Sequence, residues 1–545
     1  GGLVGRFGNV MFTTGRITDD LMSVMVRDGR IEIGAGGFNA KTAQNLGILA
    51  REIKINGQLN NDNEITAIAG EYDYDVNTKN ITKKGDNQGE VLISSSAVGG
   101  IYSRQIYLVA VGSDLGVKGD VIGDRISINA DGSVTVNKAQ GTNAIDVKGK
   151  NFTQEGSLYT EGNLTIDADS TKLNGVGTQA KDIKITGDLD NTTTIYAKGN
   201  IVVDKNTKST GQIISEKSLT IGKDLDSEEL IYGAEEVTVG GNLSNKDNLQ
   251  TEGNVNVAGD TNNKGKIVAG DKLDIKGNLD NSGTAYGETG VTVGKDLNNS
   301  GSLQSAGDIQ AKNTKNTGKI ISEKNITTKN LENSNEIIAN GKITSDNIDN
   351  KTTGKLNAGD TITANGNATN QGSIRTNGSF NISGNYINYN ETLVGGNLTS
   401  REIFNSGSMK VSEKIVGRGT FTNTGEILAN NLDVDTIGNI SNSNKIVVLE
   451  DSRLKGNNVT NTGYISSTNL DIITPTFANS GVIEVDEKIT ANNTTLNNTG
   501  YIGSNQELNL NGSNISNQGK LESANIEMNN LFAYNNLGGI INSNR

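Results

Sequence analysis

The chain has 545 residues, of which 33% are hydrophobic, 69 are Gly and one is Pro, and it has no Cys, His or Trp. Without His or Cys, the sequence excludes Ser-His-Asp triads, Cys-His dyads, His-based zinc sites and disulfides. The net charge of −13 comes without a basic stripe, which argues against nucleic acid as a partner.

Residues 1–140 carry the more apolar runs of the chain, among them 22–26, 47–50 and 106–111. Such runs indicate strands, and their length predicts a wider β-helix in this region. A polar tract near 70–90 interrupts them, which predicts a loop or hairpin outside the helix.

The polar tract contains Tyr72, Asp73, Tyr74 and Asp75. An exposed pair of tyrosines with acidic neighbours is a possible contact loop for a partner. The same four residues are equally consistent with a segment that covers an apolar strand of its own chain, and the sequence leaves both interpretations open.

From residue 141 to residue 545 the sequence repeats with a period of mostly 17 to 19 residues. The period is marked by Asn-Ser/Thr-Gly and its variants, at Asn281-Ser282-Gly283, Asn299-Ser300-Gly301, Asn316-Thr317-Gly318, Thr352-Thr353-Gly354, Asn370-Gln371-Gly372, Asn405-Ser406-Gly407, Asn423-Thr424-Gly425, Asn461-Thr462-Gly463, Asn479-Ser480-Gly481, Asn498-Thr499-Gly500 and Asn517-Gln518-Gly519.

A single period, residues 265–282, contains three short runs in which apolar and polar residues alternate, and alternation of this kind is typical of half-buried strands. The residues expected to point inward are Ile267, Ala269, Leu273, Ile275 and Leu279. Because Asn, Gly and Thr disfavour helix, a leucine-rich solenoid with helices is excluded. The fold class is therefore all-β, a right-handed parallel β-helix with coils of roughly 18 residues.

The corners of this β-helix are expected at the Gly and Asn positions. Glycine supplies a positive φ without steric cost, and asparagine tolerates the left-handed region. Because the Asn recurs at one corner, its side chains are also expected to hydrogen-bond to one another along the stack, as in an amide ladder.

Several motifs of the first region resemble the family of filamentous hemagglutinins and contact-dependent growth inhibition exoproteins, which use two-partner (type V) secretion. The motifs are Thr13–Gly15, Val26–Gly37, Leu49–Arg51, Ser96–Tyr102, Ile106–Val109 and Ile128–Thr135.

The resemblance implies two domains: residues 1–140 as the C-terminal part of a two-partner-secretion β-helix domain with an extra-helical loop near 70–90, and residues 141–545 as a rod of hemagglutinin-type repeats. It also implies a fragment of a longer precursor, located outside the cell or on the bacterial outer surface. The implied partners are an outer-membrane two-partner-secretion transporter and a host or neighbouring bacterial cell surface.

Paired carboxylates are the remaining candidates for chemistry. Acids two residues apart lie on one face of a strand, and two such carboxylates can hydrolyse a glycosidic bond. No aromatic sugar platform accompanies the pairs in this sequence. The pairs are Asp73/Asp75, Asp167/Asp169, Asp224/Asp226 and Asp433/Asp435. Four acids near coil corners are interpreted as turn residues and not as calcium ligands, namely Asp260, Asp271, Asp296 and Asp308.

We therefore expect no catalytic residue, no cofactor, no metal and no enzyme activity. The function predicted for the chain is a β-helical rod that serves as an adhesin or stalk and presents a distal binding region. The alternative is the stalk of a contact-dependent growth inhibition toxin. A third alternative is a polysaccharide-cleaving β-helix enzyme or tailspike, which predicts acids and aromatics clustered across adjacent coils.

Overall fold

A computed structural model describes residues 2–6 and 8–543, in two compact units, residues 1–277 and 278–545. The described residues form strands, turns and loops. Among them there is no helix that is long and apolar enough to cross a membrane.

The strands of unit 1 are longest in its middle part. The first eighteen are β1 (Gly2–Arg6), β2 (Asn9–Thr13), β3 (Arg16–Ile17), β4 (Ser23–Val26), β5 (Arg30–Ile33), β6 (Phe38–Asn39), β7 (Asn45–Ala50), β8 (Glu52–Ile55), β9 (Leu59–Asn60), β10 (Glu64–Gly70), β11 (Tyr72–Asp75), β12 (Ile81–Lys83), β13 (Val91–Ser95), β14 (Ile101–Tyr102), β15 (Gln105–Val111), β16 (Asp114–Ala130), β17 (Val134–Lys148) and β18 (Asn151–Thr160). From β19 (Asn163–Asp167) to β37 (Lys272–Ile275) the strands have three to five residues.

Unit 2 runs from β38 (Leu279–Asn281) to β74 (Ile540–Asn542) and consists mostly of strands of two to five residues. Five strands are longer because they continue through corners of the coil; they are β60 (Ser408–Gly417), β62 (Glu426–Asp435), β67 (Tyr464–Asn479), β68 (Val482–Asn498) and β70 (Glu507–Asn517).

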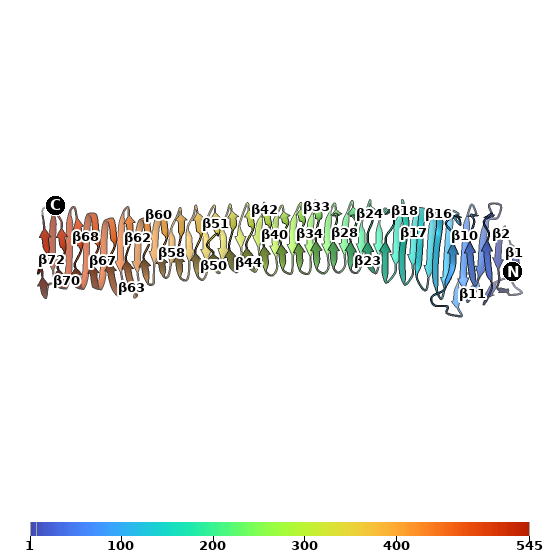
Figure 1. Cartoon of the computed structure of the whole chain (residues 1–545), viewed down its shortest axis with the longest axis horizontal. Helices are drawn as coiled ribbons and strands as arrows, with labels where there is room; N and C mark the ends of the chain where they lie inside the picture. The colour runs from blue at the N-terminus through green and yellow to red at the C-terminus, as the bar shows by residue number, and fades with distance from the viewer. Residues whose placement is uncertain (1, 7, 544–545) are drawn as a thin grey trace. The chain divides into compact units, whose positions relative to one another are not determined.

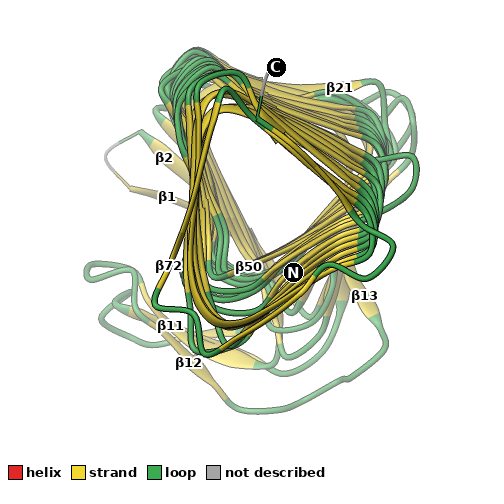
Figure 2. Ribbon diagram, turned by 90° about the vertical axis from the view of Figure 1, so that its left-hand side faces the viewer, coloured by secondary structure: helices red, strands yellow, loops and turns green. Residues whose placement is uncertain are grey.

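Each unit is a parallel β-helix in which a strand pairs with its equivalent in the next coil. In unit 2, β39 (Thr284–Gly287) pairs in register with β42 (Ser302–Ser305), so that Ala285 lies beside Leu303, 18 residues further on. The view of Figure 2 shows the three strand-lined sides of the coils with loops at the corners, and Figure 1 shows successive strands side by side within each unit. This confirms the predicted β-helix with coils of about 18 residues.

Alternating side chains fill the inside of the coils. All five residues expected to point inward from residues 265–282 are buried with 0% exposure, while Asp274 between two of them lies on the outer side and forms an ion pair with Lys276. Equivalent residues stack on one another, for example Phe380 on Leu398 and Leu398 on Ile415. Burying a side chain of this size contributes about 1.5–3 kcal/mol, so a narrow apolar axis stabilises a chain of low overall hydrophobicity.

The expected backbone role of the corner glycines is wrong. Positive φ angles occur at seven other glycines, six in unit 1 and one near the end of unit 2. None occurs at an Asn-Ser/Thr-Gly corner of the described residues. The corners need glycine for space instead. A Cβ at Gly301 would lie 2.0 Å from the carbonyl oxygen of Gly283, and a Cβ at Gly425 would lie 2.1 Å from that of Gly407. The corner asparagines likewise have ordinary negative φ angles.

Two segments of unit 1 leave the coil and form a separate sheet. The antiparallel strands β3, β4, β11 and β12 pair in the order β12-β11-β4-β3, and we call them the side sheet. They lengthen the spacing between equivalent residues, since Glu64 of β10 pairs with Gln105 of β15, 41 positions further on. In Figure 2, β11 and β12 lie outside the triangle of coils. The segment predicted as an extra-helical loop or hairpin thus contains the hairpin of β11 and β12, and the rest of residues 70–90 is mostly turn and loop.

Candidate interaction surfaces

One corner of the β-helix holds a continuous ladder of buried asparagines. In unit 2 the Nδ2 group of each asparagine donates to Oδ1 of the next at 2.6–2.9 Å. The ladder runs through Asn281, Asn299, Asn316, Asn333, Asn350, Asn370, Asn388, Asn405, Asn423, Asn442, Asn461, Asn479, Asn498, Asn517 and Asn536. This confirms the predicted amide ladder, which satisfies buried polar groups and fixes the register of the coils.

A second corner carries acids and amides that accept backbone hydrogen bonds from the next coil. In unit 1, Asp224 Oδ1 accepts from the backbone N–H of Asn242 at 2.7 Å, and Asn242 Oδ1 accepts from that of Asp260 at 2.8 Å. Of the four acids weighed as calcium ligands, Asp308 accepts from the backbone N–H of Asn325 and Asp296 accepts from Asn313 Nδ2. No group of three or more acidic side chains in the described residues is arranged to hold a metal ion.

The side sheet buries the tyrosines of the proposed contact loop. Tyr72 is 0% exposed and Tyr74 is 8% exposed, and both belong to a core cluster with Val24 and Val26 of β4. That cluster also includes three residues that face outward from the coils, Leu49, Ile68 and Val111.

The tyrosines thus match the interpretation in which the segment covers apolar strands of its own chain. Tyr72 also donates from its hydroxyl to the carbonyl oxygen of Ile68 at 2.7 Å, and burial raises its pKa well above the ordinary value. The two acids that alternate with the tyrosines, Asp73 and Asp75, face the other way, and Asp73 forms ion pairs with Arg27 at 2.8 Å and Lys84 at 3.7 Å.

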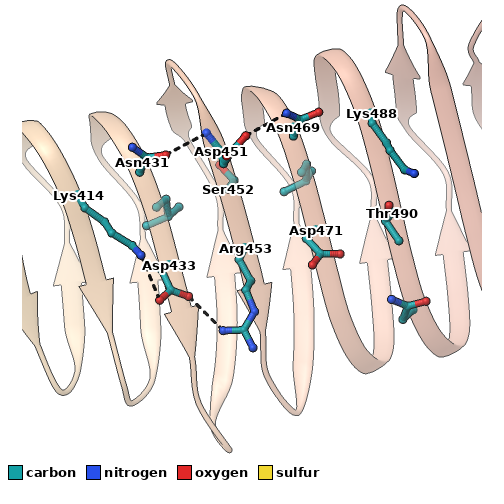
Figure 3. A pocket seen from close by; sticks show the side chains of 13 residues that line it. Lys414, Asn431, Asp433, Asp451, Ser452, Arg453, Asn469, Asp471, Lys488 and Thr490 are labelled. Carbon is teal, nitrogen blue, oxygen red and sulfur yellow. Dashed lines mark hydrogen bonds and ion pairs between the residues drawn. The ribbon is translucent and has the colours of Figure 1, made fainter.

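A groove on one face of unit 2 contains a cluster of charged side chains, which we call the Asp433 cluster. Asp433 projects outward from β62 and lies 3.0 Å from Arg418, 3.2 Å from Arg453 and 3.6 Å from Lys414. Figure 3 shows Asp433 between Lys414 and Arg453. Burial alone would raise the pKa of the Asp433 carboxyl, but its hydrogen bonds and charge interactions with the cations outweigh burial and lower the pKa.

The paired carboxylates are distributed over the two units, and several of them form ion pairs or hydrogen bonds with neighbouring side chains. Asp435 is ion-paired with Arg453 at 3.1 Å, and Asp226 lies 3.9 Å from Lys246. Asp167 accepts a hydrogen bond from the hydroxyl of Thr186 at 2.9 Å. These contacts give the acids structural partners on the surface of the coils.

Sequence reasoning missed a line of aromatic side chains on one face of unit 1. Tyr159, Tyr196 and Tyr232 occupy one outward column, each two coils from the next, with single residues between them in strict register. The signal was present in the sequence, because these tyrosines are 37 and 36 positions apart, which is two periods of the repeat. Because tyrosines are few in the chain, their regular spacing does not stand out in the sequence.

These features define a class of protein, the parallel β-solenoid of short coils, with a side sheet in unit 1 and an amide ladder in unit 2. The chain is similar to exoproteins named CdiA and filamentous hemagglutinin. It is 31% identical over 179 residues to the tRNA nuclease CdiA of Escherichia coli, which covers 31% of this chain and 5% of that protein. It is 28% identical over 172 residues to the filamentous hemagglutinin of Bordetella pertussis, which covers 29% of this chain and 4% of that protein.

A third relative is the protein adenylyltransferase and cysteine protease IbpA of Histophilus somni, 26% identical over 234 residues, 37% of this chain and 6% of that protein. The chain thus spans between 4% and 6% of the length of these relatives. No family model matches the chain, and no solved structure matches it. The similarities and the β-solenoid fold fit the resemblance to filamentous hemagglutinins and CdiA that the motifs of residues 1–140 predicted.

Proposed function

We propose that this chain is a stalk segment of a large secreted exoprotein on the bacterial outer surface, where it holds a distal adhesive region away from the cell. The observation that carries the proposal is the repetition of one coil, with the same pattern of inward positions and the same asparagine corner throughout unit 2. A structure of this kind is quasi-one-dimensional, because each coil contacts only its neighbours. Adding or removing coils then changes the distance that the stalk spans without changing the structure of the remaining coils.

The charged residues of the surface support a structural role. The acids near the corners accept backbone hydrogen bonds, as Asp224 and Asp308 do, and the Asp433 cluster is internally paired. We assign no catalytic role to the chain. The outer face of the side sheet, with Asp73 and Asp75, remains a proposed contact for a partner. The outer-membrane transporter of two-partner secretion is the proposed partner of the region 1–140.

A second candidate is the stalk of a contact-dependent growth inhibition toxin. Among the relatives, two are named tRNA nuclease CdiA and one is named 16S rRNA endonuclease CdiA. In that case the stalk would present a receptor-binding region to a neighbouring bacterium, and a toxin would be carried elsewhere in the precursor.

The test removes or adds whole coils in the full-length exoprotein and measures adhesion to host cells and inhibition of neighbouring bacteria. A stalk predicts a graded decline in whichever activity the protein has as coils are removed, with surface display unchanged on immunoblots. Loss of host adhesion alone favours the adhesin, and loss of inhibition alone favours the toxin stalk. Abolition of activity by removal of any two coils, restored by no length-matched replacement, contradicts the stalk.

A further inference from the structure

The outward column containing Tyr159, Tyr196 and Tyr232 extends along one face of unit 1. Its strands pair in parallel from β14 through β16, β17, β18, β21 (Gly177–Ala180), β24 (Thr194–Ala197), β27 (Ile213–Ser215), β30 (Ile231–Gly233) and β33 (Asn248–Thr251). In coil order its members are Tyr102, Ile122, Gln140, Tyr159, Gln179, Tyr196, Ile214, Tyr232 and Gln250. We call this set the tyrosine column; β18, β24 and β33 mark its strands in Figure 1.

The column presents aromatic surface to solvent. Tyr159 is 36% exposed, and Tyr196 and Tyr232 are half-buried, as expected of rings that lie against a sheet with one face free. Gln140, Gln179 and Gln250 lie in the same column, and each carries an amide that both donates and accepts hydrogen bonds. Aromatic rings, neutral amides and the two isoleucines Ile122 and Ile214 thus share this outward column, which contains no charged side chain.

Acidic side chains form one edge of the column. The hydroxyl of Tyr196 donates to Glu216 of the next coil, and this hydrogen bond raises the pKa of Tyr196. Burial and, after it, the charge of Glu252 raise the pKa of Tyr232. The acids therefore fix the tilt of the rings, supply acceptors for hydroxyl groups of a ligand and repel anionic ligands.

The spacing of the rings is regular. Neighbouring coils lie about 4.7–4.9 Å apart, so rings two coils apart repeat at roughly 9.4–9.8 Å. This matches the repeat of a disaccharide in an extended sugar chain. Because the column is a ridge on a flat sheet and not a concave pocket, a small molecule would gain little from it. A polymer that touches several rings at once gains affinity through multivalency.

We propose that the tyrosine column binds a linear, uncharged polysaccharide whose sugar rings stack on Tyr159, Tyr196 and Tyr232 along the axis of unit 1. The proposal deepens the adhesive function proposed above by giving the stalk itself a glycan-binding face. The gain per ring is modest, because a single aromatic stacking contact contributes about 0.5–1.5 kcal/mol. Binding is therefore expected to depend on the length of the glycan.

The test measures binding of the purified chain to β-linked glucose oligosaccharides and β-linked N-acetylglucosamine oligosaccharides of increasing length, with heparin and polysialic acid as charged comparators. The expected result is binding to at least one neutral series, with an affinity that rises until the oligosaccharide spans Tyr159 to Tyr232. Each of Tyr159→Ala, Tyr196→Ala and Tyr232→Ala is expected to weaken binding on the order of fivefold. The corresponding Phe variants keep the stacking surface and should bind nearly as well as the parent.

The matched control is Tyr389→Ala, which removes a tyrosine of unit 2 that is 50% exposed and lies outside the column. Circular dichroism of every variant checks that the coils remain folded. No binding to either neutral series, preferential binding to heparin, or equal loss in the control overturns the proposal. A triple Ala variant that changes only self-association on sedimentation also overturns it, and makes the column an interface between copies of the chain. Any of these outcomes leaves the coil-deletion test of the stalk intact.

Discussion

At the residue scale, the contacts between stacked corners restrict which amino acids the sequence can carry at the corner positions. The exposed positions of the strands are restricted less. Each corner glycine packs its Cα against a carbonyl oxygen of the coil beneath, as Gly425 does against Gly407. The buried amide ladder adds a second condition at the same corner, since Asn423 Nδ2 donates to Asn442 Oδ1 at 2.8 Å and to the carbonyl oxygen of Gly425 at 3.0 Å. Together they explain why Asn and Gly recur two residues apart.

Gly425→Ala tests the steric role of the corner. The added Cβ would lie 2.1 Å from the Gly407 carbonyl oxygen, so the backbone of two coils must separate. We expect the free energy of unfolding to fall by about 1–3 kcal/mol, measured by urea denaturation. The control is Gly417→Ala, whose nearest neighbours would be apolar atoms at 3.6–3.7 Å. Equal losses in both variants would show that crowding at the corner is not the cause.

The Asp433 cluster predicts a pH-dependent contribution to stability. Asp433 has a lowered pKa in the folded protein, so its charged form stabilises the fold above the unfolded-state pKa of about 3.9. That contribution is lost as the pH falls through the lowered folded-state value. Asp433→Asn should therefore reduce the free energy of unfolding by about 1–2 kcal/mol at pH 7, allowing for solvent screening.

The measurement for Asp433 is urea denaturation of the parent and the variant at several pH values. The difference between them should shrink as the pH is lowered from about 5 toward 2. Asp471→Asn is the control, because Asp471 lies on the same face and forms no ion pair within 4 Å with the described residues. A loss that is the same at every pH would assign the effect to packing and not to charge.

At the element scale, the alternation of each short strand decides which side chains fill the coil. In β37, Ile275 points into the core with 0% exposure, and Asp274 points outward beside Lys276. A strand of four residues tolerates no slip, because a shift of one residue would exchange the two sets of side chains. The side sheet follows the same rule, with Tyr72 and Tyr74 inward and Asp73 and Asp75 outward.

Ile275→Asp places an unpaired carboxylate inside the coil. Burying such a charge should lower the free energy of unfolding by about 3 kcal/mol or more. Asp274→Ala removes one partially exposed ion pair and should cost less than about 1 kcal/mol. Both values come from urea denaturation followed by circular dichroism. If the two substitutions had equal effects, the assignment of inward and outward faces would be incorrect.

At the scale of the whole molecule, the coil is the unit that can be gained or lost. Coil lengths vary in unit 2, and the corner glycines define them: Gly301 stacks on Gly283 after 18 residues, and Gly318 stacks on Gly301 after 17. An excision that joins Ser282 to Gly318 removes two whole coils and restores the Asn-Ser-Gly corner. An excision that removes Gly318 as well places Lys319 at the crowded corner.

We therefore expect deletion of residues 283–317 to leave unit 2 folded, with its stack shortened by roughly 9.5 Å and an unfolding midpoint close to that of the parent. Deletion of residues 283–318 should be clearly less stable, because it adds a side chain where glycine is required. Thermal denaturation and circular dichroism compare the two. If both deletions unfolded alike, the coils would not be independent units, and the stalk proposal would lose its physical basis.

The sequence by itself determined the repeating parts of this protein. The alternation of residues 265–282, the 17-to-19-residue period and the recurrent Asn corner predicted the β-helix, its inward residues and the amide ladder. These features were accessible because they are local or strictly periodic, so that one coil contains the rule for the next. The motifs of residues 1–140 also predicted the relationship to filamentous hemagglutinin and CdiA.

Only the tertiary structure decided what depends on contacts between coils. The corner glycines are required by the approach of a carbonyl oxygen 18 residues away and not by their own φ angles. Tyr72 is buried because Leu49 and Ile68 of different coils together expose an apolar strip that the side sheet covers. Tyr159, Tyr196 and Tyr232 form one column because coils of unequal length keep their strands in register. Register is set by packing and hydrogen bonding across coils, and it decides which residues of different coils share one column.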